Sequence, residues 1–154
     1  PDQADFAYDA LMSTVAERAP NARLEGALVV EMAHPGGREL ILGLKQEPGL
    51  GTLIMIGLGG IFVEVFKDAS FRFAESLTRE DAQMMLRELK SSPLIEGARG
   101  QAGLDQVTLI DALGRLARIA QDFPEIVELD INPLLAFQHG ADFRTLDARI
   151  RIEA

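Results

Sequence analysis

Glu128-Leu129-Asp130-Ile131-Asn132-Pro133, followed by Asp147-Ala148-Arg149, is the stretch that says most about the fold and chemistry of this chain. In an extended strand, side chains two residues apart leave the same face, so Asp130 and Asn132 point the same way. Pro133 indicates a strand end or edge. If the strand of Asp147 is their neighbour, three oxygen-bearing side chains converge at one sheet end. Mg²⁺ takes such oxygen ligands, usually one or two carboxylates plus substrate phosphates.

The alternative interpretation of this set is a strand that turns polar side chains to solvent. Acids are depleted in strands, and this segment lies between apolar runs, so the alternative explains the pattern less well. The set is therefore the best candidate for chemistry in the sequence.

Composition limits the class of protein. With 154 residues the chain fits one domain with a real core. A net charge of −9 argues against a nucleic acid or an anionic membrane as partner, but not against a nucleotide whose phosphates Mg²⁺ neutralises. The absence of cysteine excludes disulfides and thiolate sites. No signal peptide or apolar run of roughly 20 residues is present, so we expect a cytoplasmic protein. Because the chain starts at Pro1, we expect a fragment of something longer.

The apolar periodicity predicts an α/β fold with a mostly antiparallel sheet and helices packed on one face. A first helix is predicted over residues 5–18, and two more begin at the N-caps Thr78 and Asp105. A loop is expected over residues 93–103. Predicted strands cover residues 28–32 and 38–46, which we expect to form a hairpin, and then 53–56, 61–66, 70–73, 127–137 and 143–152.

The glycine-rich run Gly57-Leu58-Gly59-Gly60 directly follows a predicted strand. Consecutive backbone N–H groups here could form a nest for a phosphate, and a tight turn between two strands is equally compatible. The run fits neither a dinucleotide fingerprint nor a P-loop.

Four further charged residues are weaker candidates. Glu31, Glu39 and Glu64 could each hydrogen-bond a ribose or support a metal, although an exposed sheet face is favoured for any one of them alone. Arg99 could face a phosphate or carboxylate, and a plain loop is as compatible.

Taken together, these segments resemble the ATP-grasp domain of ADP-forming acyl-CoA synthetases, including relatives fused to protein acetyltransferase domains. The nucleotide-binding subunit of succinyl-CoA synthetase is a more distant relation. The resemblance runs from about Asn21 to Ile152 and rests on motifs in the family's order and spacing: Leu28–Met32, Gly37–Gly43, Gly57–Glu64, Phe66–Asp68, Leu94–Gly100, Glu128–Pro133 and Asp147–Ile150.

The resemblance implies an ATP-grasp fold, in which two lobes hold Mg-ATP between them. Residues 1–20 then form an N-terminal helix at the end of a missing first lobe, and residues 21–154 form the second, C-terminal lobe. The first lobe's lysine-bearing strand and glycine-rich loop are not found before residue 21. The CoA-binding and ligase domains, and the histidine that carries the phosphoryl group, are also absent. We therefore expect the fragment to be inactive alone, with CoA and acyl substrate bound by those other domains.

The resemblance also implies roles for individual residues. Asn132 and Asp147 resemble the Mg²⁺ ligands, and Asp130 takes the acidic position that faces the phosphohistidine. Glu31 and Met32 resemble the hinge that meets adenine and ribose. The remaining positions are Glu39 near the nucleotide and Gly59 and Gly60 in the phosphate-facing loop. Relatives have Asp-Pro-x-Phe-Gly-Pro where this chain has Glu47-Pro48-Gly49-Leu50-Gly51-Thr52.

The implied reaction is acyl-CoA + ADP + phosphate ⇌ acid + CoA + ATP, through an acyl phosphate and a phosphorylated histidine. ATP versus GTP and the acyl group stay open. The rival hypothesis is a regulatory or interaction module of a protein acetyltransferase with vestigial nucleotide binding. A generic α/β domain is the third interpretation. A lone lobe would also expose the surface that faces its partner lobe, so self-association is plausible.

Overall fold

The computed structural model describes residues 2–59, 68–98, 100, 102–138 and 143–153. Residues Pro1–Ala33 and His34–Ala154 form two compact units. The division lies later than the predicted boundary after residue 20, because residues 21–33 group with the first helix rather than with the sheet. None of the helices in the described part of the chain is long and apolar enough to cross a membrane.

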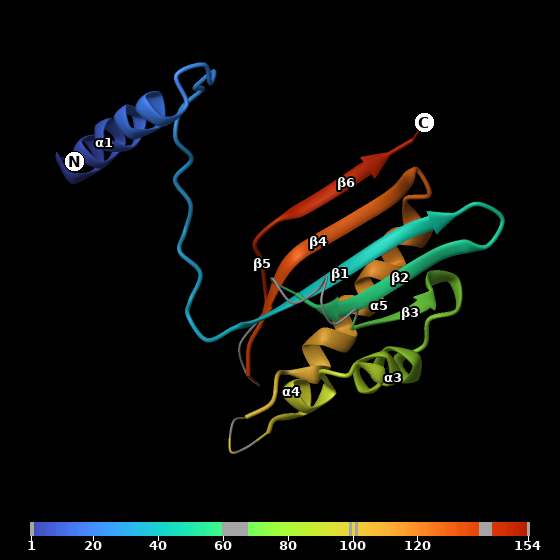
Figure 1. Cartoon of the computed structure of the whole chain (residues 1–154). Coiled ribbons are helices and arrows are strands. Elements are labelled where there is room, and N and C mark those ends of the chain that lie inside the picture. The colour runs from blue at the N-terminus through green and yellow to red at the C-terminus, as the bar shows by residue number, and fades with distance from the viewer. Residues whose placement is uncertain (1, 60–67, 99, 101, 139–142, 154) are drawn as a thin grey trace. The chain divides into compact units, whose positions relative to one another are not determined.

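The first unit consists of helix α1, Asp2–Arg18, and an extended segment without strand pairing (Figure 1). The predicted helix is confirmed. The predicted strand at Leu28–Met32 is wrong, and so is its hairpin with residues 38–46. Leu28, Val29 and Met32 are 88%, 93% and 88% exposed. These side chains favour a strand, but a strand also needs a neighbour for its backbone, and the described residues of this unit supply none.

The second unit contains a six-stranded sheet, and every pairing among its described strands is antiparallel. The strand order is β3-β2-β1-β4-β5, with β6 also paired to β4. The strands are β1 Arg38–Glu47, β2 Gly51–Leu58, β3 Ala69–Phe73, β4 Ile126–Ala136, β5 Arg144–Thr145 and β6 Ala148–Ile152. In place of the predicted hairpin partner, β1 pairs with β2 and β4.

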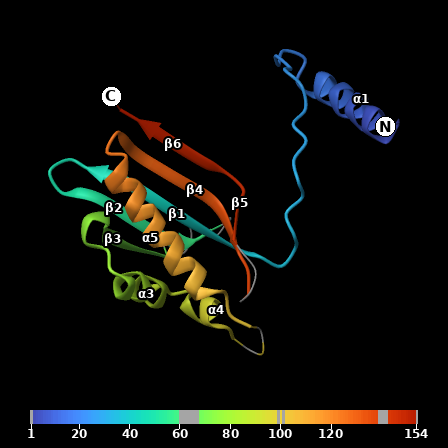
Figure 2. The same ribbon diagram turned by 180° about the vertical axis from the view of Figure 1, so that it is seen from behind.

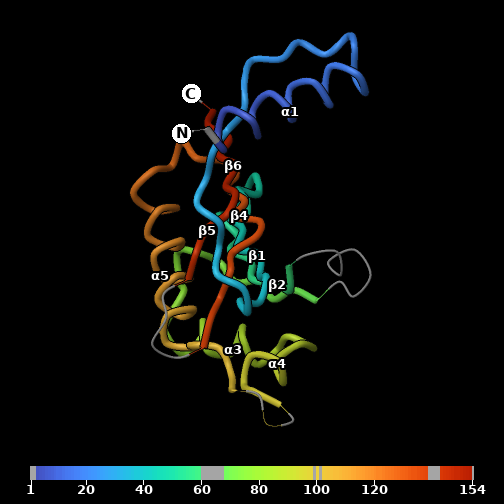
Figure 3. The backbone as a smooth tube through the Cα atoms, turned by 90° about the vertical axis from the view of Figure 1, so that its left-hand side faces the viewer, coloured from blue at the N-terminus to red at the C-terminus, as the bar shows by residue number. Residues whose placement is uncertain are grey.

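Helices cover one face of this sheet, as predicted (Figures 1, 2 and 3). They are the 3-10 turn η2 Ala74–Ser76, α3 Arg79–Glu88, α4 Ser92–Glu96 and α5 Gln106–Asp122. The short α4 corrects the loop predicted over residues 93–103. Pro93 is compatible with the first turn of a helix, where no backbone hydrogen bond is lost, and Ile95 anchors the turn in the core.

Both predicted N-caps are confirmed. The Asp81 backbone N–H donates to Thr78 Oγ1 at 3.1 Å, and the Thr78 N–H donates to Asp81 Oδ2 at 3.0 Å, which completes a capping box. The Thr108 N–H donates to Asp105 Oδ1 at 3.1 Å at the start of α5. These caps satisfy backbone donors that the first helical turns leave without partners.

The core lies between the sheet and the helices. Alternate residues of β1 and β2 enter it, which is the period-two pattern seen in the sequence. They meet the apolar faces of α3 and α5, which follow the period of 3.6 residues. The fully buried members are Leu40, Leu42, Leu44, Ile54, Ile56, Met85, Leu86, Leu109 and Leu113. Each such side chain contributes about 1.5–3 kcal/mol of transfer free energy on burial, so this layer holds the sheet in place.

A charged network ties the edge strand β3 to α3. Arg72 Nη2 and Nη1 lie 2.5 and 3.1 Å from Glu88 Oε1 and Oε2, and the Ser70 hydroxyl donates to Glu88 Oε2 at 2.7 Å. The Arg72 guanidinium, and then the Ser70 hydroxyl, hold the pKa of Glu88 below its ordinary value. The network therefore stabilises the fold only while Glu88 is ionised.

We expect Glu88→Gln to lower the free energy of unfolding at pH 7, and the difference from the native chain to vanish in acid. A carboxyl with a depressed folded pKa stabilises above its unfolded pKa, and that contribution is lost as pH falls through the folded value. Because the Glu88 side chain is 48% exposed, the effect is about 1 kcal/mol or less. Urea midpoints from pH 7 to about 3, with Glu96→Gln as control, measure it. A difference independent of pH would contradict the expectation.

Candidate functional site

The candidate site lies on the sheet face opposite the helices, which we call the open face. In Figures 1 and 2, no described helix of the second unit covers it. The register aligns Gly43 of β1 with Asp130 of β4, and Asp130 with Arg149 of β6. Since Leu42 and Leu44 enter the core, Gly43 between them faces the other way, and Asp130 and Arg149 share that open face.

Asn132 and Asp147 lie next to each other at the end of the β4–β6 ladder. The Asn132 backbone N–H donates to the Asp147 carbonyl at 3.1 Å, one position beyond the paired residues Ile131 and Ala148. The two residues continue the alternation from Asp130 and Arg149. The structure therefore brings the backbone positions of Asp130, Asn132 and Asp147 together at one end of the ladder, and their role as ligands stays a prediction.

A β-bulge in β4 changes which face of the sheet its residues take after this site. β4 carries an extra residue where its register with β1 shifts between Leu40 and Leu42, at Asn132-Pro133. Strict alternation would turn Leu134 to the open face with Asp130, but the extra residue returns it to the core, where it is fully buried. The prediction that Pro133 marks a strand end or edge is wrong: Pro133 lies inside β4, and its carbonyl accepts from the Leu146 N–H at 3.0 Å.

Charged groups of both signs act on Asp130. Partial burial raises the pKa of Asp130; the Arg149 cation lowers it, and the Glu128 and Asp147 carboxylates raise it. Asp147 is therefore near enough to act on Asp130. A cation placed here would relieve this repulsion.

The donors present fit Mg²⁺ in their chemistry. Two carboxylates and one amide oxygen are hard ligands of the kind that Mg²⁺ prefers. Among the described residues, no group of three or more His, Cys, Asp or Glu side chains is arranged to hold a metal alone. A cation would therefore need further oxygens, such as those of water or phosphate.

Beside Asp130, a pocket of about 350 Å³ combines cationic and apolar walls. Arg149 and Lys45 contribute positive charge, Lys45 being paired with Glu47. The carboxylates of Glu47, Glu128 and Asp130 also line the pocket. The apolar wall comes from Leu53, Met55 and Phe71. The sequence analysis did not select Lys45 or Arg149. The period-two spacing of Glu128 with Asp130, and of Asp147 with Arg149, puts each pair on one strand face and could have pointed to these cations.

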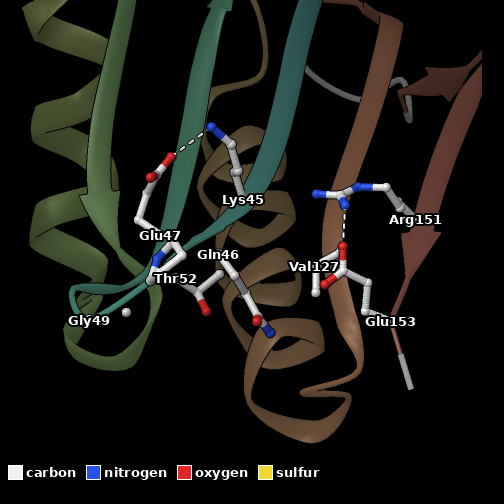
Figure 4. A pocket seen from close by; sticks show the side chains of 10 residues that line it. Lys45, Gln46, Glu47, Gly49, Thr52, Val127, Arg151 and Glu153 are labelled. Atoms are coloured by element: carbon white, nitrogen blue, oxygen red, sulfur yellow. Dashed lines mark hydrogen bonds and ion pairs between the residues drawn. The ribbon is translucent and has the colours of Figure 1, made fainter.

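A second pocket, of about 610 Å³, lies toward the β1–β2 turn (Figure 4). Its cations already have anionic partners. Lys45 Nζ is 2.8 Å from Glu47 Oε1, and Arg151 contacts both Glu153 and Glu128, the latter at 3.2 Å. Although this pocket is the larger one, an incoming phosphate would compete with these carboxylates. Lys45 and Glu47 line both pockets, but Asp130 and Arg149 line only the first, so the Asp130–Arg149 end of the open face is the better candidate.

The remaining predicted site residues are placed differently. Glu31 and Met32 are exposed in the first unit, and Glu39 is exposed on β1. The Gly59 N–H donates to the Glu39 carbonyl at 2.8 Å, and a Cβ at Gly59 would lie 2.7 Å from the Glu39 carbonyl carbon. Gly59 thus allows two backbone segments to pack closely, and its N–H is already bound to the Glu39 carbonyl. The predicted contact of Gly59 with a phosphate stays a prediction. Gly60, Glu64 and Arg99 lie outside the described residues, and so does the strand predicted over residues 61–66.

Comparison with known proteins identifies the family. The profile of an ATP-grasp domain family matches residues 1–152. The chain is 43% identical over 141 residues to acetate–CoA ligase [ADP-forming] I of Archaeoglobus fulgidus, covering 90% of this chain and 20% of that protein. It is 40% identical over 149 residues to the beta subunit of acetate–CoA ligase [ADP-forming] I of Pyrococcus furiosus, covering 97% and 62%.

A solved structure is also similar. It is acetyl-coenzyme A synthetase 1 of Ca. Korarchaeum cryptofilum with coenzyme A and Mg-AMPPCP, its phosphohistidine segment pointing towards the nucleotide-binding site. The TM-score is 0.72 at 42% identity, over 78% of this chain and 55% of that one. The chain thus spans between a fifth and about three fifths of the length of the curated relatives quoted above. It belongs to the ATP-grasp domain family and is homologous to part of the ADP-forming acyl-CoA synthetases.

Proposed function

We propose that this chain supplies one face of the nucleotide site in an ADP-forming acyl-CoA synthetase. The observation that carries the proposal is the juxtaposition of Asp130, Asn132 and Asp147 on a sheet face that no described helix of its unit covers. The relative solved with Mg-AMPPCP supports a magnesium–nucleotide ligand. The kinship with ligases also disfavours the rival hypothesis of a regulatory module with vestigial binding.

In this proposal Asn132 and Asp147 hold Mg²⁺ through side-chain oxygens, and phosphate oxygens complete its coordination. When bound, the ion neutralises charge on the β- and γ-phosphates. Arg149 lies across from Asp130 and contributes a further positive charge to the phosphates, while Lys45 closes the pocket beside them. Asp130 faces the group that accepts or donates the phosphoryl, so its carboxylate orients the phosphohistidine of the partner domain.

We further propose that the first unit belongs to the other lobe. Its exposed run Leu28–Met32 has the composition of a strand and lacks a neighbouring strand within the unit. The missing part of the first lobe would provide that neighbour, placing Glu31 and Met32 at the hinge beside adenine and ribose. This assignment moves the lobe boundary from residue 20 to residue 33.

The complete enzyme then converts acyl-CoA, ADP and phosphate to acid, CoA and ATP through an acyl phosphate and a phosphohistidine. This chain serves the step between phosphohistidine and nucleotide. CoA and the acyl group bind the domains that the longer relatives possess beyond this region.

Titration of the chain with Mg-AMPPCP, followed by amide NMR shifts, tests the proposal. NMR detects millimolar binding, which is the strength expected of half a site. We expect shifts at Gly43, Asp130 and Arg149 that require Mg²⁺, and no shifts at Arg118 and Asp122 near the end of α5. Shifts confined to other parts of the molecule, or none at about 10 mM ligand, would overturn it.

A further inference from the structure

A third pocket lies on the helix side of the sheet, away from the open face. It has a volume of about 590 Å³, within the usual range for small-molecule sites. Its walls come from the start of α3, the first half of α5 and strand β5, elements that Figure 2 shows from the helix side. The lining residues are Arg79, Val107, Thr108, Asp111, Arg115, Phe143 and Arg144.

The charges in this pocket are unusual for a chain with a net charge of −9. Three arginines and a single carboxylate line it. Asp111 Oδ2 accepts from Arg115 Nε at 2.8 Å, which leaves Arg79 and Arg144. In the part of the chain that the structure describes, neither of these two makes an ion pair or a hydrogen bond through its side chain. Lys45 and Arg151 on the open face, by contrast, are each held by glutamates.

From this arrangement we infer that the pocket binds a phosphate group, either free phosphate or the phosphate of an organic monoester. Guanidinium groups donate in pairs to phosphate oxygens, and the two that lack an ion pair within the described part of the chain, from α3 and β5, together supply donors for several phosphate oxygens. The Thr108 hydroxyl, half-buried beside them, adds a donor. The partly buried Phe143 ring and the exposed Val107 side chain give an apolar surface for the organic part of an ester.

The N-terminal ends of α3 and α5 add positive electrostatic potential to this pocket but do not themselves bind the ligand. Arg79 is the first residue of α3, and Val107 and Thr108 lie in the first turn of α5. The N-terminal ends of helices carry partial positive charge. Their caps, however, are already filled by Thr78, Asp81 and Asp105, so the arginine side chains must carry the binding.

This phosphate pocket is independent of the proposed nucleotide site. It shares no lining residue with the open-face pockets, and the sheet separates the two. A ligand held here would contact α5, whose other face packs against the strands that position Asp130. The pocket is therefore placed to take a phosphorylated metabolite as a second, non-reacting ligand.

Calorimetric titration of the chain with inorganic phosphate and with phenyl phosphate tests the inference. We expect binding that the double variant Arg79→Gln/Arg144→Gln weakens at least about tenfold, because it removes the two cations that donate charge-assisted hydrogen bonds to the phosphate. Arg118→Gln is the matched control, since it removes an arginine of α5 that pairs with Asp122 outside the pocket. Arg149→Gln should also leave this binding unchanged.

The two probes distinguish the two sources of phosphate. Tighter binding of phenyl phosphate assigns the pocket to an organic monoester, and equal binding assigns it to free phosphate. Absence of binding by both probes at about 10 mM would overturn the inference. So would binding that the double variant leaves intact or that Arg149→Gln abolishes, because the ligand would then be on the open face.

Discussion

Asp147→Ala is expected to abolish nucleotide-dependent phosphorylation of the histidine in the complete enzyme. The Asp147 backbone is held beside Asn132 by the β4–β6 ladder, and its carboxylate acts electrostatically on Asp130. Removing it deletes one of the two proposed metal ligands, and bound metal contributes several kcal/mol to charge stabilisation. We expect a loss of about 10²–10³-fold or more in the rate, with little change in stability because Asp147 is exposed.

The matched control is Asp122→Ala, which removes an exposed carboxylate of α5 that pairs with Arg118. Its phosphorylation rate should equal that of the native enzyme. Transfer of phosphate from labelled ATP to the enzyme, measured with Mg²⁺ in excess, gives both rates. Native phosphorylation by Asp147→Ala would show that the ion is held elsewhere, and a parallel loss in Asp122→Ala would point to unfolding rather than to chemistry.

The sequence predicted the elements whose patterns are local. The caps at Thr78 and Asp105 and the alternation of Leu40, Leu42 and Leu44 depend on neighbours within a few residues, and the structure contains them all. Leu28–Met32 has equally good strand residues and forms no strand, because strand formation depends on a distant partner that propensity does not reveal. The short helix at Ser92–Glu96 was missed for a related reason: Ile95 is drawn into a core assembled from other elements.

The same distinction holds for the candidate site. Asp130, Asn132 and Asp147 could be grouped from period-two spacing, since adjacent strands joined by a short connection meet in a predictable register. The bulge at Asn132-Pro133 could not be foreseen, because it depends on how Leu134 fits the core formed with β1. Gly59 suggested a phosphate loop, whereas its close approach to the Glu39 backbone explains the glycine through packing alone.

Asp68 is a polar position where a single substitution should cost much stability. It is only 8% exposed, and its carboxylate accepts two backbone hydrogen bonds from the turn between α3 and α4. The Lys90 N–H lies 2.6 Å from Oδ1, and the Ser91 N–H lies 2.8 Å from Oδ2. The Asp68 carbonyl meanwhile accepts from the Leu58 N–H at 3.2 Å. One residue therefore joins the end of β2, the start of β3 and the beginning of α4.

We expect Asp68→Ala to lower the free energy of unfolding by about 2–4 kcal/mol, because it leaves two N–H groups without an acceptor in a site that water does not reach freely. The Ser91 hydroxyl, itself buried without a partner among the described residues, cannot accept from both. Asp68→Asn keeps one acceptor oxygen in place and should lose about half as much. Asp122→Ala, at an exposed ion pair, should lose less than about 1 kcal/mol. Urea unfolding at pH 7 ranks the three variants, and an Asp68→Ala midpoint equal to that of Asp122→Ala would mean that the turn is held by its apolar contacts instead.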